Sequence, residues 1–289
     1  MPYAGDLVGT MKLLIGIFII LNFSVASAQE ETTTSTIELP NAKKNQPGWI
    51  IGVAFDSASF RYQEPGIMTV NGRINGINAQ ASYKGDSSLW FLGNATYLTG
   101  DTLYDGRLNN VEKTPIQNVD HFTIMDFAAK GLILTDVSTS VGTSLYFGIG
   151  QRTTDDANDP SPSDYFRRHI YNYYSLGVHV DAPHSSTTAS TWIVGIDTLA
   201  NGTTETRLSD VDPSYADFTM KFKGGSALNI EWQYRTLIDL GTIYGGIAYS
   251  RWNLNQSEVA TVFNDGFEER YIEPKNSTTT ISLKLGAQF

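Results

Sequence analysis

Apolar and polar residues alternate with a period of two through most of the chain after residue 48. The stretch 277–289 shows the pattern clearly, because its large apolar residues all share one parity and polar residues fill most of the other. Successive side chains of a β-strand point to opposite faces, so this stretch is predicted to be a strand with one apolar face. The apolar positions singled out on this strand are Ile281, Leu283, Leu285 and Phe289.

About ten stretches with strand character recur along the chain, and residues typical of turns separate them. No helical stripe of useful length interrupts them. The sequence therefore predicts an all-β fold. The predicted strands are 49–62, 73–84, 88–103, 120–134, 141–152, 165–180, 188–199, 218–235, 241–254 and 277–289.

The connections between these strands alternate between short and long. The short ones lie near 84–88, 135–140, 181–187 and 236–240. The long ones, which are rich in Asn, Asp, Gly and Pro, lie near 63–72, 104–119, 153–164, 200–217 and 255–276. In an antiparallel barrel all the long connections would fall at one end. That asymmetry is typical of outer-membrane barrels, which have short periplasmic turns and long external loops.

Strands with an apolar and a polar face suit a barrel that has lipid outside and a lumen inside. Closure is required because an open sheet edge would leave unpaired backbone groups in hydrocarbon. We therefore predict a closed antiparallel transmembrane β-barrel over residues 49–289, with ten strands, or with eight or twelve as alternatives. A soluble β-sandwich or a lipocalin-like barrel is the alternative architecture.

An export signal is predicted before the barrel. A positive charge at Lys12 precedes a short apolar core and an Ala-x-Ala site, which are the parts of a secretory signal peptide. The core is shorter than the roughly 20 residues of a membrane helix, so a membrane anchor is the lesser alternative. We predict a signal peptide over 1–28, cleaved near Ala28, with Met11 as an alternative start. A flexible periplasmic leader is predicted over 29–48.

Composition and charge narrow the classes of function. The 289 residues include 12% aromatics and 26 glycines, which together favour strands. A formal charge of −10 argues against a nucleic-acid surface, which needs a basic stripe. The chain has no cysteine, which excludes disulfides and thiolate metal sites. The acidic stretches 153–164 and 210–217 lack the spacing of a known calcium loop, so neither a metal site nor a cofactor is predicted.

The chain resembles bacterial outer-membrane β-barrel proteins in its signal peptide, its alternating strands and its C-terminal aromatic residue. Within that class it resembles a family of small, poorly characterised barrels. The motifs that carry this resemblance are FRYQEPG (60–66), YDG (104–106), LYFGIGQR (145–152), YNYYSLG (171–177), EWQYR (231–235) and EPKN (273–276).

This resemblance implies a barrel of about ten strands in the bacterial outer membrane, and it implies no chemical activity. The expected partners are outer-membrane lipids and lipopolysaccharide, with an extracellular ligand at the acidic loops as a further candidate. The last strand is expected to be the segment that barrel-assembly machinery reads. Its signal residues are Ile281, Leu283, Leu285 and Phe289.

Charged residues on the predicted lumen face are candidates for an ionic network. A narrow lumen has to be filled with side chains, and buried charges need partners. We therefore predict a largely plugged lumen and a structural or surface-interaction role. A narrow channel for small solutes is the alternative, although a wide aqueous pore takes 16–18 strands. The network residues are Glu64, Arg152, Glu231 and Arg235.

An outer-membrane enzyme is the second alternative. Omptin proteases also have ten strands, with a paired-Asp and an Asp-His site at the rim, but that pattern does not map onto this chain residue by residue. Lipid-modifying barrels use a Ser-His pair on a lipid-facing strand, and no histidine here has a convincing serine companion. We predict no catalytic residue. The rim residues weighed for this role are Asp155-Asp156, Glu268-Glu269, His121 and His169.

Overall fold

The structure is a computed structural model, and it describes residues 48–84, 89–107, 114–136, 141–158, 165–264 and 266–289. The predicted signal peptide (1–28) and leader (29–48) lie outside the described residues, except for Gly48, which already belongs to the first strand. Among these residues, none forms a helix with the length and apolar character to cross a bilayer.

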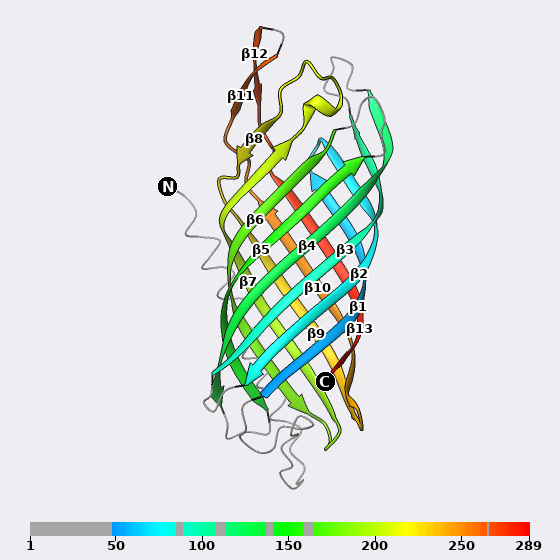
Figure 1. Cartoon of the computed structure of the whole chain (residues 1–289), viewed down its shortest axis with the longest axis vertical. Helices are drawn as coiled ribbons and strands as arrows, with labels where there is room; N and C mark the ends of the chain where they lie inside the picture. The colour runs from blue at the N-terminus through cyan, green and yellow to red at the C-terminus, as the bar shows by residue number, and fades with distance from the viewer. Residues whose placement is uncertain (1–47, 85–88, 108–113, 137–140, 159–164, 265) are drawn as a thin grey trace. The chain divides into compact units, whose positions relative to one another are not determined.

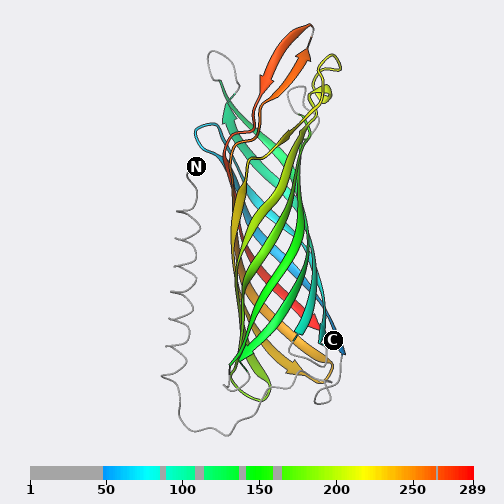
Figure 2. The same cartoon turned by 90° about the vertical axis from the view of Figure 1, so that its left-hand side faces the viewer.

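Ten antiparallel strands of the described chain form a closed barrel (Figure 1, Figure 2). Neighbours in the barrel are neighbours in chain order, and the last strand returns to pair with the first. This confirms the predicted fold class and the predicted ten strands. They are β1 (Gly48–Glu64), β2 (Met68–Lys84), β3 (Leu89–Arg107), β4 (Pro115–Asp136), β5 (Gly142–Asn158), β6 (Arg167–Pro183), β7 (Thr188–Thr206), β9 (Gly225–Ile238), β10 (Gly241–Leu254) and β13 (Asn276–Gln288).

The seam between β1 and β13 closes the barrel. Its register runs without a break from Gly52 to Gln63 on β1. At the end of the seam, Ile51 and Phe289 exchange two backbone hydrogen bonds of 3.0 and 2.8 Å. Closure therefore leaves neither β1 nor β13 as a free edge along this register.

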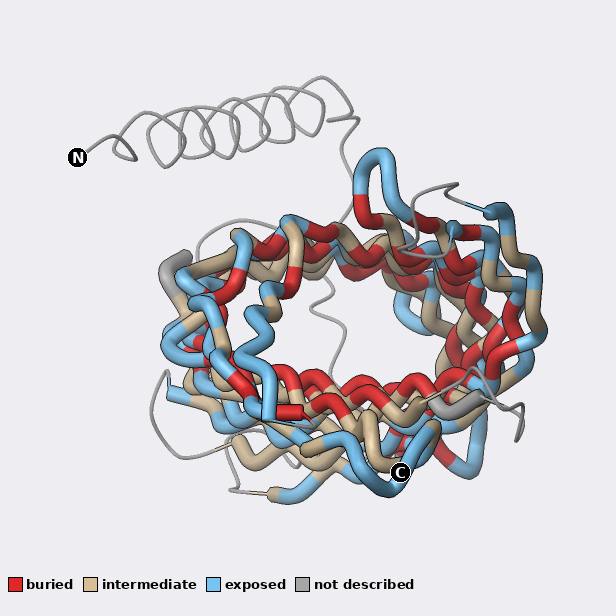
Figure 3. The backbone as a smooth tube through the Cα atoms, turned by 90° about the horizontal axis from the view of Figure 1, so that it is seen from above, coloured by how far each residue is buried: buried red, intermediate tan, exposed pale blue. Residues whose placement is uncertain are grey.

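Side chains alternate between the outside and the lumen, as the sequence pattern predicts. Figure 3, viewed along the barrel, shows buried and exposed positions alternating along the strands. Large apolar side chains on the outer face are exposed, and together they form a band that we call the apolar belt. Its members include Trp49, Ile51, Val53, Phe55, Ile77, Phe91, Tyr97, Phe127, Ile133, Leu145, Phe147, Ile149, Leu176, Ile243, Ile247, Ile281, Leu283 and Leu285.

The two ends of the barrel differ. The end at which β2, β4, β6 and β9 end is called the turn end, and the other the loop end. A strand of 17 residues such as β1 is roughly 55 Å long, or roughly 40 Å along the barrel axis once its tilt is included. A membrane-spanning apolar band is about 25 Å tall, so the strands extend beyond the belt toward the loop end.

This extra length corrects four of the predicted connections. In 153–164 and 200–217, β5 and β7 continue to Asn158 and Thr206. Residues 63–72 are predicted as a long loop, but most of them belong to β1 and β2. Only 65–67 form the tight turn between the two strands, with Gly66 at φ +76°. Much of 104–119 is likewise strand. Most outward residues of 63–72 and 104–119 are polar, although Val119 is an exposed apolar exception. Without apolar residues at alternate positions, the sequence pattern predicts loops there instead of strands.

The segment predicted as one strand over 218–235 is two strands, which is a second correction. β8 (Phe218–Lys221) pairs with β7, and β9 begins only after Gly224, whose φ of +152° breaks the strand. The connection 255–275 also contains an unpredicted hairpin, β11 (Ala260–Asn264) and β12 (Phe267–Tyr271). This hairpin projects from the loop end in Figures 1 and 2.

The alternation makes a depth-dependent prediction for the outer wall. Leu285 lies in the β13 part of the belt with 70% of its surface exposed. We expect Leu285→Arg to lower the free energy of unfolding by about 2–4 kcal/mol, because it places a charge in the lipid. Ser277→Arg, on the same face nearer the loop end, should cost about 0–1 kcal/mol. Urea titrations in lipid vesicles measure both, and equal losses would contradict the assigned belt.

Candidate functional site in the lumen

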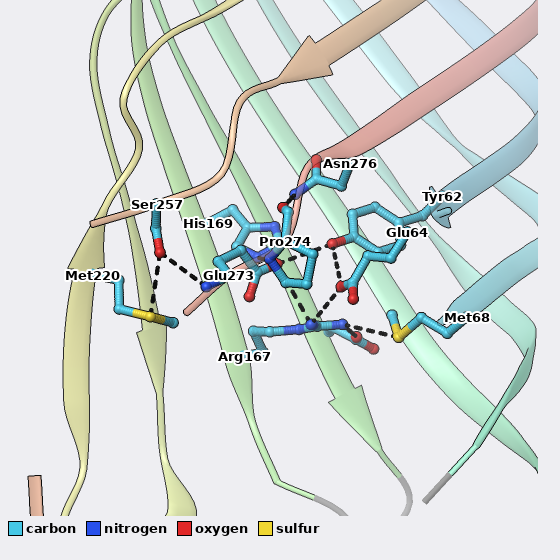
Figure 4. A network of polar contacts seen from close by, with 11 residues as sticks. Tyr62, Glu64, Met68, Arg167, His169, Met220, Ser257, Glu273, Pro274 and Asn276 are labelled. Carbon is cyan, nitrogen blue, oxygen red and sulfur yellow. Dashed lines mark hydrogen bonds and ion pairs between the residues drawn. The ribbon is translucent and has the colours of Figure 1, made fainter. Parts of the chain in front are cut away.

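Six polar side chains meet inside the barrel near the loop end, and we call them the rim network. Figure 4 labels all of them except Asp156. Strand parity turns five of them inward from β1, β5 and β6, and the sixth comes from the segment before β13. All are at least nine-tenths buried. They are Tyr62, Glu64, Asp156, Arg167, His169 and Glu273.

Arg167 is the centre of the rim network. Its Nη1 lies 3.1 Å from Glu64 Oε1 and 3.6 Å from Glu273 Oε1, and its Nη2 lies 3.2 Å from Asp156 Oδ2. The guanidinium also sits 5.6 Å from the centre of the Tyr62 ring. Three carboxylates around one buried cation satisfy its charge, and each depends on it to offset the cost of leaving water.

Tyr62 and His169 complete the network. The Tyr62 hydroxyl lies 2.8 Å from Glu64 Oε1 and 3.0 Å from Glu273 Oε1, so its single hydrogen is shared between two acceptors. His169 Nε2 is 3.3 Å from Glu273 Oε1, and its ring stacks against both Tyr62 and Tyr171. Ring stacking therefore positions Tyr62 and His169, the two aromatic side chains that contact Glu273.

The network joins opposite walls of the barrel. Glu64 is on β1 and Arg167 is on β6, and these strands are five positions apart whichever way the barrel is followed. Their 3.1 Å contact therefore runs across the lumen rather than along one wall. Aromatic residues bridge other walls farther in, with Phe60 and Phe122 4.4 Å apart and Tyr171 and Trp252 5.5 Å apart.

The four lumen residues named from the sequence lie in three separate clusters. Glu64 belongs to the rim network, where its cation is Arg167. Arg152 lies farther in, 3.6 Å from Asp126, which also accepts a 2.6 Å hydrogen bond from Tyr173. In each of these two clusters a tyrosine hydroxyl donates to the carboxylate: Tyr62 to Glu64, and Tyr173 to Asp126.

Glu231 and Arg235 share the third cluster. Glu231 accepts hydrogen bonds from Lys284 at 2.9 Å and from Gln233 at 2.6 Å. Arg235 donates to the Gln233 side chain at 3.0 and 3.1 Å, so Gln233 links the acid to the base. No described contact joins this cluster to Glu64 or Arg152. That the four residues act as one functional network stays a prediction.

Sequence reasoning missed the residues that complete these clusters. Arg167 and His169 have the lumen parity of the predicted strand 165–180, so the alternation alone could have found them. Glu273 stands outside any strand, in the EPKN motif, and no periodicity indicates where its side chain points. Its place in the network depends on how the segment before β13 folds back over the lumen.

The acidic pairs weighed for catalysis are not paired in space. Asp156 points inward to Arg167, whereas Asp155 points outward and binds Arg168 through two contacts of 2.7 and 2.8 Å. Glu268 binds Arg270 at 3.1 Å on the hairpin, and Glu269 accepts from Asn264 at 2.7 Å. Adjacent residues of a strand face opposite ways, which explains why neither pair converges.

The acidic loop 210–217 uses its carboxylates for turns. Asp212 accepts from the Ser214 backbone and hydroxyl, and these bonds lower the pKa of the Asp212 carboxyl. Asp217 accepts from the Ser209 backbone at 3.0 Å. In the part of the chain that the structure describes, no three His, Asp or Glu side chains gather to hold a metal ion.

Comparison with known proteins supports the fold. No protein-family model and no curated protein sequence matches the chain. Among solved structures, the outer membrane protease OmpT from Escherichia coli superposes with a TM-score of 0.53 and 9% identity, covering 90% of this chain and 99% of that one. Ail, the attachment invasion locus protein of Yersinia pestis, gives 0.34 and 10% over 83% and 99% of the chains. Neisserial surface protein A gives 0.29 and 11% over 83% and 97%.

The likeness to OmpT, at 9% identity, bears on the fold alone. The chain has the closed barrel fold of outer-membrane proteins. The scores of the last two are too low to carry an argument. The role of the chain has to be inferred from its own residues.

Removing the central cation tests the rim network. We expect Arg167→Met to lower the free energy of unfolding by about 3–5 kcal/mol, because three buried carboxylates lose their partner. Arg270→Met breaks an ion pair whose arginine is 73% exposed, and should cost less than about 1 kcal/mol. Urea titration of both variants gives the comparison. Equal losses would show that the network does not hold the loop end together.

Acidification should weaken the network through Glu273. Burial raises the pKa of Glu273, but Arg167 and His169, whose Nε2 lies 3.3 Å away, outweigh burial and hold this pKa below its usual 4.5. The ionised carboxylate thus stabilises the barrel above about pH 4.5, and this contribution is lost as the pH falls through the lowered pKa. Unfolding titrations at about pH 6 and about pH 3 should show a smaller drop in Glu273→Gln than in the natural chain. An equal drop would contradict this assignment.

Proposed function

We propose that the chain is an integral protein of the bacterial outer membrane, with a largely closed lumen and a structural or surface-interaction role. The belt supports the membrane location, since a row of exposed aromatic and aliphatic side chains around a closed barrel needs lipid to cover it. The long connections at the loop end would then face outside the cell, and the turn end the periplasm.

The observation that carries the closed lumen is the contact between Glu64 and Arg167. A 3.1 Å ion pair between diametrically opposed strands occupies the space that a solute would have to cross. Ten strands enclose a lumen that side chains can fill, unlike the 16–18 strands of a water-filled porin. Transport through this barrel would require the pair to separate and leave buried charges without partners.

The hairpin supports the surface-interaction part of the proposal. Phe263 and Phe267 have 68% and 73% of their surfaces exposed, and Val259 beside the hairpin has 55%. Exposed apolar side chains on a projecting element are typical of contact surfaces rather than of inert loops. The belt ends well before this element, so bilayer lipid does not explain these side chains.

Conductance in planar bilayers tests the closed lumen. We expect no stepwise current from the natural chain, because the rim network crosses the lumen. The double variant Tyr62→Ala with Arg167→Ala removes the bridge and should give measurable current steps, if it migrates on gels as a folded, heat-modifiable barrel. Arg168→Ala, which alters the outward-facing neighbour, serves as the control and should stay silent.

Stepwise current from the natural chain would overturn the closed lumen and favour the narrow-channel alternative. The membrane location is tested separately by fractionation. A chain that stays soluble without detergent, and shows no heat-modifiable migration, would contradict it.

A further inference from the structure

Three side chains on the outer wall form a hydrogen-bonded relay. His121 on β4 has its Nδ1 atom 2.9 Å from Asp101 Oδ1 on β3, and its Nε2 atom 2.8 Å from Thr99 Oγ1, also on β3. An acid, an imidazole and a hydroxyl bonded in this order form the arrangement with which hydrolases activate a nucleophile. We call Thr99, His121 and Asp101 the outer-wall triad.

Strand register builds the triad. Asp101 and His121 face each other across β3 and β4, and Thr99 faces Thr123 on the next outward pair. All four side chains are outward because odd positions of both strands point away from the lumen. The contact between Thr99 and His121 is therefore diagonal, a distance that a long side chain covers easily in an antiparallel pair.

The triad interrupts an apolar stretch of wall. Toward the turn end, the outward residues of these two strands include Tyr97 and Phe127, which belong to the belt. Toward the loop end, the next outward pair is Leu103 and Val119, which are 49% and 59% exposed. Ionisable residues between lipid-facing apolar residues are costly, and such groups usually have a functional reason.

Besides the outward ion pair of Asp155 and Arg168, the outer wall has lateral polar bonds between neutral groups. Gln151 on β5 donates to Asn172 on β6 at 2.8 Å, and Asn172 donates to Asn201 on β7 at 2.7 Å. This amide row joins three strands without an acid or a base. The triad goes beyond such bonding, because it joins an acid to a hydroxyl through an imidazole.

We propose that the outer-wall triad is a hydrolytic site for fatty-acyl esters of membrane lipids. Thr99 is the nucleophile, His121 the general base and acid, and Asp101 the positioning residue that fixes the imidazole. Asn75 faces Thr99 from the outer side of β2, and its amide is the side-chain donor assigned to the oxyanion of the intermediate.

Each step of the reaction balances with water as the only co-reactant. Thr99 Oγ1 attacks the ester carbonyl carbon, and its proton passes to His121 Nε2. The C–O bond to the lipid alcohol breaks, and the alcohol leaves with the proton from His121. Water then gives a proton to His121 and attacks the acyl-threonine ester. The bond between the acyl carbon and Thr99 Oγ1 then breaks, and the fatty acid leaves. Thr99 Oγ1 takes the proton back from His121.

The location selects the class of substrate. This inference rests on the proposed membrane location, because only then does the wall beside Tyr97 contact lipid chains. An acyl chain lying on the belt beside Tyr97 and Phe127 would bring its ester linkage to the first polar groups of this wall toward the loop end, and the triad supplies such groups. Side-chain exposures of 54% for His121 and 75% for Asp101 leave the relay open to a ligand from the lipid side.

The experiment measures release of fatty acid from phospholipid vesicles that contain the folded full chain. The natural chain should hydrolyse the ester, and Thr99→Ser should retain activity. Thr99→Val and His121→Gln should each lower the rate at least about 100-fold. A fluorophosphonate probe should label the natural chain at Thr99, and mass spectrometry of the peptides locates the label.

Asp101→Asn separates positioning from a structural role. It should lower the rate roughly 100-fold or more and change its dependence on pH, whereas a structural loss would lower the rate equally at every pH. His184→Gln is the matched control. This histidine is bonded to Ser190 at 2.8 Å, no described carboxylate contacts it, and its loss should leave the rate unchanged.

Two results would overturn the proposal: no ester hydrolysis and no labelling by the natural chain, or full activity in Thr99→Val. Heat-modifiable migration and membrane fractionation of the same samples are read in parallel. A folded, membrane-bound chain without hydrolysis contradicts the triad alone. A chain that is not membrane-bound contradicts the proposed function as well.

Discussion

Pairing of every backbone donor and acceptor along a closed ring of strands is the constraint on which the rest of this structure depends. In an apolar layer an unpaired N–H or C=O has no water to bind, so a sheet is stable there only when its edges meet. The unbroken register between β1 and β13 meets that condition. Given closure, strand parity divides the side chains between lipid and lumen, and the alternation along the chain follows from it.

Closure also creates the lumen and decides what it contains. The lumen of a ten-stranded barrel is narrow, so a charged side chain on one wall can reach the opposite wall. Arg167 reaches Glu64 in this way. Buried carboxylates are costly unless their partners are close, and the rim network supplies these partners from three strands and one connecting segment. The closed lumen that we propose rests on these contacts, because the side chains that satisfy the charges lie between opposite walls. In that proposal the outer wall and the loop end are the surfaces left for contact with other molecules.

The sequence predicted the strands well where lipid dictates the pattern and less well elsewhere. The apolar parity of Ile281, Leu283 and Leu285 fixed the orientation of β13, and all three are exposed on the outer face. Beyond the belt, outward positions become polar, and the alternation that marks a strand disappears. For this reason the turn at 65–67 and the hairpin β11–β12 were not predicted.

The clusters could not be predicted from parity, because parity says which residues share a face and not which ones meet. Glu64 and Arg167 are 103 positions apart, and their contact depends on the strand number and the shear of the barrel. Thr99 and His121 are 22 positions apart, and their contact depends on the register of β3 and β4. A search for a serine beside each histidine overlooked the threonine that this register supplies.

The most direct test of the closed barrel is a cross-link across its seam. Ser57 and Leu283 face each other on β1 and β13, and the chain contains no cysteine of its own. Directly opposed Cα atoms in an antiparallel pair lie about 4.5–5.5 Å apart, within reach of a disulfide. We expect Ser57→Cys with Leu283→Cys to form an intramolecular disulfide on oxidation, and Ser57→Cys with Ala287→Cys to form none. Disulfides that join only separate copies of the chain would contradict closure.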